Sequence, residues 1–401
     1  MIIASILILA FVLWILWIVH LPRKQEKGSW GQLSEETCGN KICTYTDFGA
    51  MFADLLADIG EARKCIHVQF FKFVPDLVGI ELSSAMIDKA KDDIDTRLLY
   101  DSLCCQSWHW YYKSLAQQGI LVAGYNRVTW PFFQRKSNFR NHRKIVIIDD
   151  KIAYIGGMNI AQQYKTGLSW GNWRDTMIRI EGPAAISLHR IFMSDWNLST
   201  RQQPFVISPT TTNLNSAGGC RIHIIASGPH DDGHTILNYL IHALNHCQKY
   251  AYFESPYFIP PPELMHALCC AARRGVDIRV LLPPHGDNGE APQWASRSRF
   301  AKAMEAGIRI GIYQSGFMHS KLMVTDDCLA FVTSANIDYR SYFLSQEVAA
   351  AIADNEYALA LKKIFLQDEA ESEYITPNQW RHRPLTNKAK EKLCQLISFQ
   401  L

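Results

Sequence analysis

The sequence lacks a large excess of charge of either sign. Its 401 residues carry 41 lysines and arginines against 38 aspartates and glutamates, which gives a formal net charge of +3. A nuclease that binds nucleic acid through a wide basic face usually carries more positive charge. The composition therefore argues against nucleic acid as the main partner, while a hydrophobic share of 48% is that of a folded globular protein.

Cysteine pairs with the spacing of a zinc site are also missing. The 11 cysteines are an odd number, and no two of them stand in a Cys-x-x-Cys arrangement. The adjacent pairs Cys104–Cys105 and Cys269–Cys270 lie among core-like residues. This usage predicts reduced thiols and a catalytic part in the cytosol.

The first 21 residues contain no Asp, Glu, Lys or Arg. Residues 2–21 are nearly all apolar, and a run of about 20 such residues is what a bilayer core requires. The alternative, a signal peptide, is disfavoured because no positive region precedes the run and no A-x-A cleavage site follows it. We expect an uncleaved single-pass anchor over 1–21 and a juxtamembrane linker over 22–45. Arg23, Lys24 and Lys27 then place the remaining residues in the cytoplasm.

From residue 46 onward, helical and strand patterns alternate, and the same order occurs twice. In the first half we expect helices over 48–62, 78–90 and 108–118, and strands over 65–73, 96–100, 120–124, 141–149 and 152–155. In the second half we expect helices over 235–247, 261–274 and 296–306, and strands over 250–258, 276–282, 308–313, 318–326 and 329–332. The pattern predicts an α/β fold with a largely parallel sheet. The repetition predicts two duplicated α/β/α domains, over 46–205 and 206–401, joined near 202–219, which is rich in Pro, Ser, Thr and Asn.

One motif stands at matched positions in the two halves. The copies are His142-x-Lys144-x4-Asp149 with Asn159 ten residues further on, and His319-x-Lys321-x4-Asp326 with Asn336 ten residues further on. Residues i and i+2 of a strand share a face, so each histidine projects together with its lysine. A phosphate between the two copies explains these residues, because the lysines neutralise its charge and the asparagines donate to its oxygens. Asp149 and Asp326 end their strands at odd spacing, and we expect them to face away and support the framework.

Two histidines suit phosphodiester transfer. One imidazole attacks phosphorus and forms a covalent phosphohistidine. The other donates a proton to the leaving alcohol and then takes one from the incoming alcohol. The lysines supply the positive charge, so we expect neither a metal nor a cofactor.

The paired motifs resemble the HxKxxxxD signatures of the phospholipase D superfamily, and the chain is similar to bacterial cardiolipin synthases. The matching stretches are residues 141–161, 173–184, 255–260, 271–283, 316–321 and 334–341. The resemblance implies a phosphatidylglycerol substrate, cardiolipin and glycerol as products, and a location at the bacterial inner membrane. It implies His142 as nucleophile and His319 as acid/base without fixing that order. It also implies that Asp175 and Glu347 orient the histidines.

Several alternatives stay open at this point. Water as acceptor would make the chain a phospholipase D, and a phosphatidylserine synthase or a nuclease of the superfamily are further alternatives. A membrane-tethered binding module is disfavoured because both motifs are complete. Thr333-Ser334 and Ser345 stand where the family commonly has glycine and asparagine, and one apolar segment stands where many relatives have two.

Three further features bear on the substrate. The basic run of Arg135, Lys136, Arg140 and Arg143 is either a binding site for anionic headgroups or a solvated loop. Residues 130–133 (WPFF) form a candidate membrane-contact loop. By family analogy, Tyr257 and Arg297 line the acceptor side.

Overall fold

The computed structural model describes residues 34–127, 138–201, 217–229, 234–286 and 289–400. The anchor predicted over 1–21 and the loop over 130–133 lie outside these residues. Within the described ranges, no helix has both the length and the apolar character that crossing a membrane demands.

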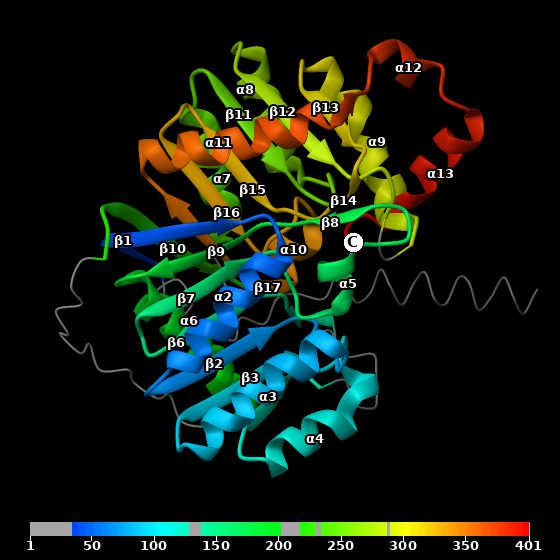
Figure 1. Cartoon of the computed structure of the whole chain (residues 1–401). Coiled ribbons are helices and arrows are strands. Elements are labelled where there is room, and N and C mark those ends of the chain that lie inside the picture. Colours follow the sequence, from blue (N-terminus) through cyan, green and yellow to red (C-terminus); the bar gives the residue numbers. More distant parts are fainter. Residues whose placement is uncertain (1–33, 128–137, 202–216, 230–233, 287–288, 401) are drawn as a thin grey trace, which may run out of the picture.

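The first half of the chain forms a sheet flanked by helices (Figure 1). Its strands are β1 (Glu35–Tyr45), β2 (Cys65–Phe70), β3 (Asp95–Asp101), β4 (Leu121–Tyr125), β6 (Ile145–Ile148), β7 (Ile152–Gly156) and β9 (Met177–Glu181), with the short β5 (Arg140–Asn141) and β8 (Asn172–Arg174). Its helices are α2 (Phe48–Glu61), α3 (Leu77–Lys91), α4 (His109–Gln117), α5 (Gln162–Thr166) and α6 (Ala184–Thr200), with the 3-10 turn η2 (Gln106–Trp108).

The second half repeats this arrangement. Its strands are β10 (Cys220–Ser227), β11 (Tyr250–Glu254), β12 (Asp277–Leu282), β13 (Arg309–Tyr313), β15 (Leu322–Thr325), β16 (Leu329–Thr333) and β17 (Ser345–Ile352), with the short β14 (Gly316–Met318). Its helices are α7 (Thr235–His246), α8 (Pro262–Arg273), α9 (Ala291–Glu305), α10 (Tyr339–Phe343) and α11 (Asn355–Ala370). The chain ends with β18 (Ser372–Tyr374), α12 (Pro377–Arg381) and α13 (Leu385–Leu396).

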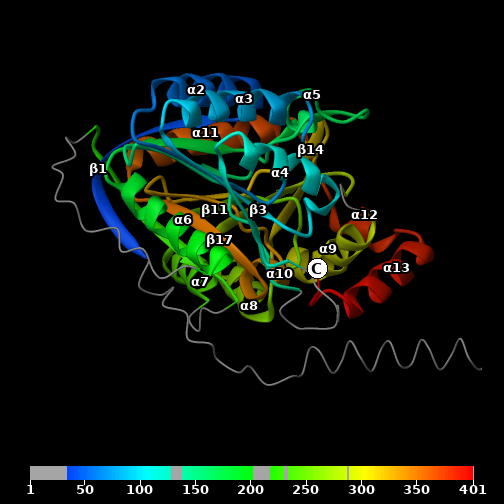
Figure 2. The ribbon, with the colours of Figure 1, turned by 90° about the horizontal axis from the view of Figure 1, so that it is seen from below.

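The two halves share one continuous sheet. It runs β18-β13-β12-β11-β15-β16-β17-β10-β1-β9-β7-β6-β2-β3-β4, so the strands on the two sides of the antiparallel β1–β10 pair follow matching orders. Figure 2 shows α2, α3 and α11 along one side of the sheet and α6, α7 and α8 along the other. The predicted duplicated α/β fold is confirmed by this arrangement.

The expectation of a largely parallel sheet is wrong. In each half only three neighbouring strands are parallel to one another, β2-β3-β4 and β11-β12-β13, and the strands that follow the histidines are antiparallel. Parallel neighbours need a long crossover, whereas antiparallel neighbours can be joined by a tight turn. The turn from β6 to β7 has Asp149 and Asp150 at positive φ (55° and 60°), and Asp326 and Asp327 repeat it (53° and 60°). Such paired positive φ angles match the twist of an antiparallel hairpin.

The linker prediction over 22–45 is wrong for residues 35–45. This segment is β1, which pairs with β9 of its own half and with β10 of the other half. Its residues alternate mostly between exposed and half-buried positions, and only Asn40 and Tyr45 are buried, so its hydrophobic signal is weak. The central strands are different, because every residue of β2, β6 and β15 is buried. Such strands give the continuous apolar runs by which the sequence marks them.

Candidate active site

A short parallel ladder between the two halves places His142. β5 pairs with β17 in the register Ser345↔Arg140 and Gln346↔Asn141, and the His142 amide donates to the Gln346 carbonyl at 3.0 Å. The next residue on each strand is therefore a histidine on one and Glu347 on the other. The Nδ1 atom of His142 lies 2.9 Å from Oε1 of Glu347.

A second ladder of the same kind places His319. β8 pairs with β14 in the register Phe317↔Trp173 and Met318↔Arg174, and the His319 amide donates to the Arg174 carbonyl at 2.7 Å. The Nδ1 atom of His319 lies 2.5 Å from Oδ2 of Asp175. Each histidine is therefore held by a carboxylate of the other half. In a neutral ring whose Nδ1–H donates to a carboxylate, Nε2 keeps its lone pair for chemistry.

The two motif lysines are buried beside these histidines. Lys144 and Lys321 are 0% and 2% exposed, and their ammonium groups donate to the backbone carbonyls of His142 and His319. Burial lowers the pKa of Lys144 to about 7; Glu347 opposes the shift, and the charge of Lys321 adds to it. Two buried cationic groups side by side disfavour one another. A bound phosphate would relieve both by supplying negative charge.

The carboxylates that contact the histidines have lowered pKa values, which favours their ionised form. Burial alone would raise the pKa of Glu347, but His142 and Lys144 outweigh it and hold that pKa below its usual range. The pKa of Asp175 is lowered in the same way, because His319 and Lys321 outweigh burial. For the His142 imidazole, burial lowers the pKa, although Glu347 opposes this. A largely neutral imidazole that contacts an ionised carboxylate is the form a nucleophile or general base requires.

Asp149 and Asp326 lie apart from this site. In each half the histidine lies before one end of a strand, β6 or β15, and the aspartate follows the other end of that strand. Each aspartate carboxylate accepts hydrogen bonds from three backbone N–H groups at the start of a neighbouring strand. The donors are Arg63, Lys64 and Cys65 for Asp149, and Gln248, Lys249 and Tyr250 for Asp326. These contacts join the turn to the sheet and leave the phosphate chemistry to other groups.

The two motif asparagines are not equivalent. Asn336 lines a cavity together with His142, and its buried Oδ1 has no hydrogen-bond partner among the described residues. Asn159 is engaged with its own half: its Oδ1 accepts from the Lys72 amide at 3.1 Å and its amide donates to the Tyr164 hydroxyl at 2.6 Å. The structure thus brings Asn336 to the cavity and gives Asn159 protein partners.

The cavity beside His142 has a volume of about 400 Å³. It is lined by Phe71, Leu103, Cys104, Asn138, Arg140, His142, Tyr257, Ile259, Pro292, Asn336, Asp338, Arg340, Ser341, Ser345, Glu347 and Gln400. Tyr257 was expected here from the sequence, but Arg340 and Gln400 were not. Arg340 donates to the Gln400 carbonyl at 2.8 Å, so the C-terminal segment closes one wall. No local motif could reveal this wall, because its residues are far apart in the sequence.

Arg140 and Arg143, the two described residues of the basic run, do not form a solvated loop, and Arg140 also lines the cavity beside His142. Arg140 pairs with Asp101 at 3.0 Å and Arg143 with Asp195 at 2.6 Å, and all four side chains are buried. Arg135 and Lys136 lie outside the described residues.

Arg297 does not line the cavity beside His142. Its guanidinium carbon lies 5.4 Å and 5.2 Å from the ring centres of Trp294 and Trp380. This stacking gives the side chain a packing role.

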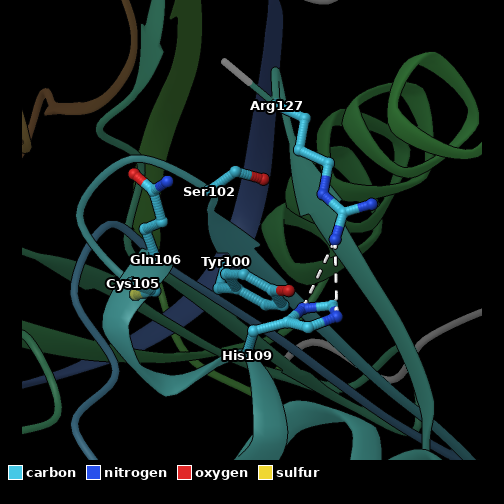
Figure 3. A pocket seen from close by; sticks show the side chains of 6 residues that line it. All are labelled: Tyr100, Ser102, Cys105, Gln106, His109 and Arg127. Atoms are coloured by element: carbon cyan, nitrogen blue, oxygen red, sulfur yellow. Dashed lines mark hydrogen bonds between the residues drawn. The ribbon is translucent and has the colours of Figure 1, made fainter. Parts of the chain in front are cut away.

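A second pocket, of about 280 Å³, lies in the first half. Figure 3 shows its lining residues Tyr100, Ser102, Cys105, Gln106, His109 and Arg127, with Arg127 pointing at the His109 ring. None of them belongs to the paired motifs or lines the cavity beside His142.

Comparison with known proteins places the chain in a family. The family model described as cardiolipin synthase, PLD-like domain, matches residues 55–196 and 240–369. The chain is 35% identical over 365 residues to cardiolipin synthase 2 of Staphylococcus epidermidis, covering 90% of this chain and 75% of that protein. It is 34% identical over 367 residues to the major cardiolipin synthase of Bacillus subtilis, with the same coverage of 90% and 75%.

A solved structure shares the fold. The crystal structure of a phosphatidylserine synthase of Haemophilus influenzae superposes with a TM-score of 0.69 at 16% identity, over 90% of this chain and 95% of that one. At this identity the likeness concerns the fold alone. The family match and the curated relatives lead to one assignment: the chain belongs to the cardiolipin synthase family of phospholipase D-like proteins.

Proposed function

We propose that this protein is a cardiolipin synthase that transfers a phosphatidyl group from one phosphatidylglycerol to a second, giving cardiolipin and glycerol. The observation that carries the proposal is the pair of imidazoles held by carboxylates of opposite halves, with two buried lysines beside them. One phosphodiester is exchanged for another, so the reaction needs no nucleotide to drive it. Its relatives named as cardiolipin synthases support this substrate class.

The first half-reaction forms the covalent intermediate. Nε2 of His142 attacks phosphorus, and the bond from phosphorus to the oxygen of the headgroup glycerol breaks. His319 donates its proton to that oxygen. Lys144 and Lys321 neutralise the charge that develops on the phosphoryl oxygens. The lowered pKa of His142 and its place in the lined cavity support this residue as the nucleophile.

The second half-reaction reverses these roles. A headgroup hydroxyl of a second phosphatidylglycerol attacks the phosphohistidine, His319 takes the proton of that hydroxyl, and the bond from phosphorus to nitrogen breaks. Water in place of the hydroxyl would give phosphatidic acid. We place the transferred phosphate near Asn336 as well, because this residue lines the same cavity as His142.

The proposed location is the bacterial inner membrane. Residues 1–21 would form a single-pass anchor, and the two halves would lie in the cytoplasm. The apolar run and the basic residues Arg23, Lys24 and Lys27 that follow it support this arrangement. An anchor would keep the site at the surface where both lipid substrates lie.

The test is turnover of phosphatidylglycerol alone by the detergent-solubilised chain. Glycerol, cardiolipin and phosphatidic acid are measured for the wild type, for His142→Ala and His319→Ala, and for His246→Ala, an exposed histidine of α7 that serves as control. The proposal is supported if the wild type and the control form cardiolipin and glycerol, and the two site variants form neither product. Phosphatidic acid as the sole lipid product would make the protein a hydrolase.

A trapping experiment tests the order of the two histidines. With a phosphatidyl donor that carries a label in its acyl chains and a p-nitrophenol leaving group, which departs without a proton, His319→Gln should accumulate protein-bound label on His142, because the second half-reaction lacks its base. Label on His319 in the converse variant His142→Gln would reverse the assignment.

A further inference from the structure

Three side chains that can bind metal converge in the first half, away from the histidine site. Cys65 and His67 project from the same face of β2, and His189 comes from α6, which packs on that face. One ligand atom from each, the sulfur and two ring nitrogens, all lie within 4.8 Å of one another. All three residues are buried. The Cys65 amide is bound by Asp149, so the cluster lies at the end of the sheet opposite His142.

The outer nitrogens of both rings are held by carboxylates. Nε2 of His67 lies 3.2 Å from Oδ2 of Asp95, and Nδ1 of His189 contacts Oδ1 of Asp150. This is the arrangement of metal-binding histidines, in which the second ring nitrogen donates to a carboxylate that fixes the tautomer and the ring orientation. The inner nitrogens are thereby turned toward each other and toward the cysteine sulfur.

The close contact between the two imidazoles needs a proton or a metal ion at its centre. If both outer nitrogens carry the hydrogens that the carboxylates accept, each neutral ring presents a lone pair to the other. Those two inner nitrogens, Nδ1 of His67 and Nε2 of His189, are only 2.8 Å apart. Two lone pairs at this distance repel, so either a shared proton or a metal ion must lie between them.

The second half of the chain provides an internal comparison. The positions equivalent to Cys65 and His67 hold Tyr250 and Tyr252. The carboxylates are kept: Tyr250 donates to Asp327 and Tyr252 to Asp277, while Lys362 of α11 pairs with Asp327. The same backbone is therefore stable with hydroxyl and ammonium groups. The thiol and the two imidazoles of the first half are not demanded by the fold.

We propose that Cys65, His67 and His189 form a binding site for a zinc ion, with water or a small anion as the fourth ligand. Zinc–nitrogen bonds of about 2.0–2.1 Å in a tetrahedron place the two nitrogens about 3.3 Å apart, so the rings must separate by about half an ångström. Binding replaces the shared proton and converts the thiol to a thiolate, which releases two protons to solvent. The site goes beyond phosphatidyl transfer and does not depend on it.

The ion would fix helix α6 to strand β2. Six residues along α6 from His189 stands Asp195, which binds Arg143, the residue that follows His142 in the sequence. Zinc would therefore act as a structural support for a helix that also holds this arginine.

Metal content and cobalt spectroscopy of the full detergent-solubilised chain test the proposal. After growth with zinc and dialysis, the wild type should retain one zinc ion per chain. Cys65→Ser and His189→Gln should lose it, whereas Cys247→Ser, which removes a buried cysteine of the second half, should keep it. Cobalt added to the zinc-free protein should give a thiolate-to-cobalt absorption band that Cys65→Ser lacks and Cys247→Ser keeps.

A third variant separates loss of zinc binding from misfolding. The triple change Cys65→Tyr, His67→Tyr and His189→Lys copies the residues of the second half and should fold without binding zinc. A wild type that takes up no zinc and gives no thiolate band with cobalt would overturn the proposal. Zinc retained equally by the wild type and Cys65→Ser would overturn it as well. Turnover of phosphatidylglycerol is measured separately, so failure of the proposed function would leave these outcomes readable.

Discussion

Replacing Glu347 with glutamine removes one negative charge from the site and keeps its shape. The glutamine oxygen can still accept from Nδ1 of His142, and its amide can donate to the Ser334 hydroxyl that now contacts the carboxylate. What is lost is the stabilisation of the imidazolium that forms whenever this ring is protonated. The same charge also fixes which ring nitrogen carries the hydrogen.

The size of the effect follows from the geometry. Opposite charges about 4 Å apart at an effective dielectric constant of about 20 attract by about 4 kcal/mol. The neutral hydrogen bond that glutamine keeps is worth about 1 kcal/mol, which leaves a loss of about 3 kcal/mol. At 1.36 kcal/mol per tenfold change in rate, we expect kcat/KM to fall by about 100-fold.

The pH profile separates this effect from a packing defect. Glu347 raises the pKa of His142 against the effect of burial. Without the carboxylate that pKa falls further, and an imidazole that must be neutral to attack stays active to lower pH. Glu347→Gln should therefore lower the plateau of kcat/KM and move its acid limb to lower pH.

The assay is initial-rate cardiolipin formation from phosphatidylglycerol in mixed micelles across a pH series, with the unfolding temperature measured in parallel. Glu373→Gln, an exposed glutamate of β18, is the matched control and should behave as the wild type. A Glu347→Gln enzyme within about threefold of wild-type kcat/KM, a change of under 1 kcal/mol in transition-state stabilisation, would refute the reasoning.

Three further outcomes follow from the same site and its framework. Because Lys144 has a pKa of about 7 in the unliganded protein and must be protonated to neutralise a phosphate, kcat/KM should fall as pH rises through about 7, and a profile flat from pH 6 to 9 would contradict this. Asp326→Asn should weaken the turn that binds three amides and lower the unfolding free energy by about 1–3 kcal/mol, seen by denaturant titration, with kcat per folded molecule unchanged. Asp195→Asn leaves the buried Arg143 without its counter-charge and should cost about 3–5 kcal/mol of stability in the same titration, and a loss under 1 kcal/mol would show that the pair is dispensable.

The duplicated fold could be predicted because the motifs repeat with their strands and helices in one order. Strand direction could not, since an apolar run such as Ile145–Ile148 looks the same in a parallel or an antiparallel sheet. β1 could not be predicted either, because most of it is exposed or half-buried, and its pairing to β10 joins residues that are far apart in the sequence. Local pattern therefore fixes the elements, and long-range pairing decides how they are combined.

The same limit applies to the site. The sequence predicts Asp175 and Glu347 as partners of the histidines, but either carboxylate could serve either ring. Only the parallel ladders between β5 and β17, and between β8 and β14, decide that each histidine meets the acid of the other half. Arg340 and Gln400 carry no local signal, because they become neighbours of His142 only when the C-terminal segment folds back.

The two halves keep one architecture around the site and use different residues to maintain it. In the first, Arg143 follows the histidine, pairs with Asp195 of α6 and donates to the Glu347 carbonyl at 2.9 Å. In the second half, the residue after the histidine is Ser320, whose side chain is too short to make both contacts.

Arg174, on strand β8 of the ladder between β8 and β14, makes the corresponding contacts. It precedes the acid instead of following the histidine, pairs with Asp368 of α11 and donates to the Asp175 carbonyl at 2.6 Å. At both histidines a buried arginine thus joins the backbone of the orienting carboxylate to an aspartate on the equivalent helix. Because the arginine can come from either strand of the ladder, the two motifs match in histidine, lysine and aspartate and still differ in the residue between histidine and lysine.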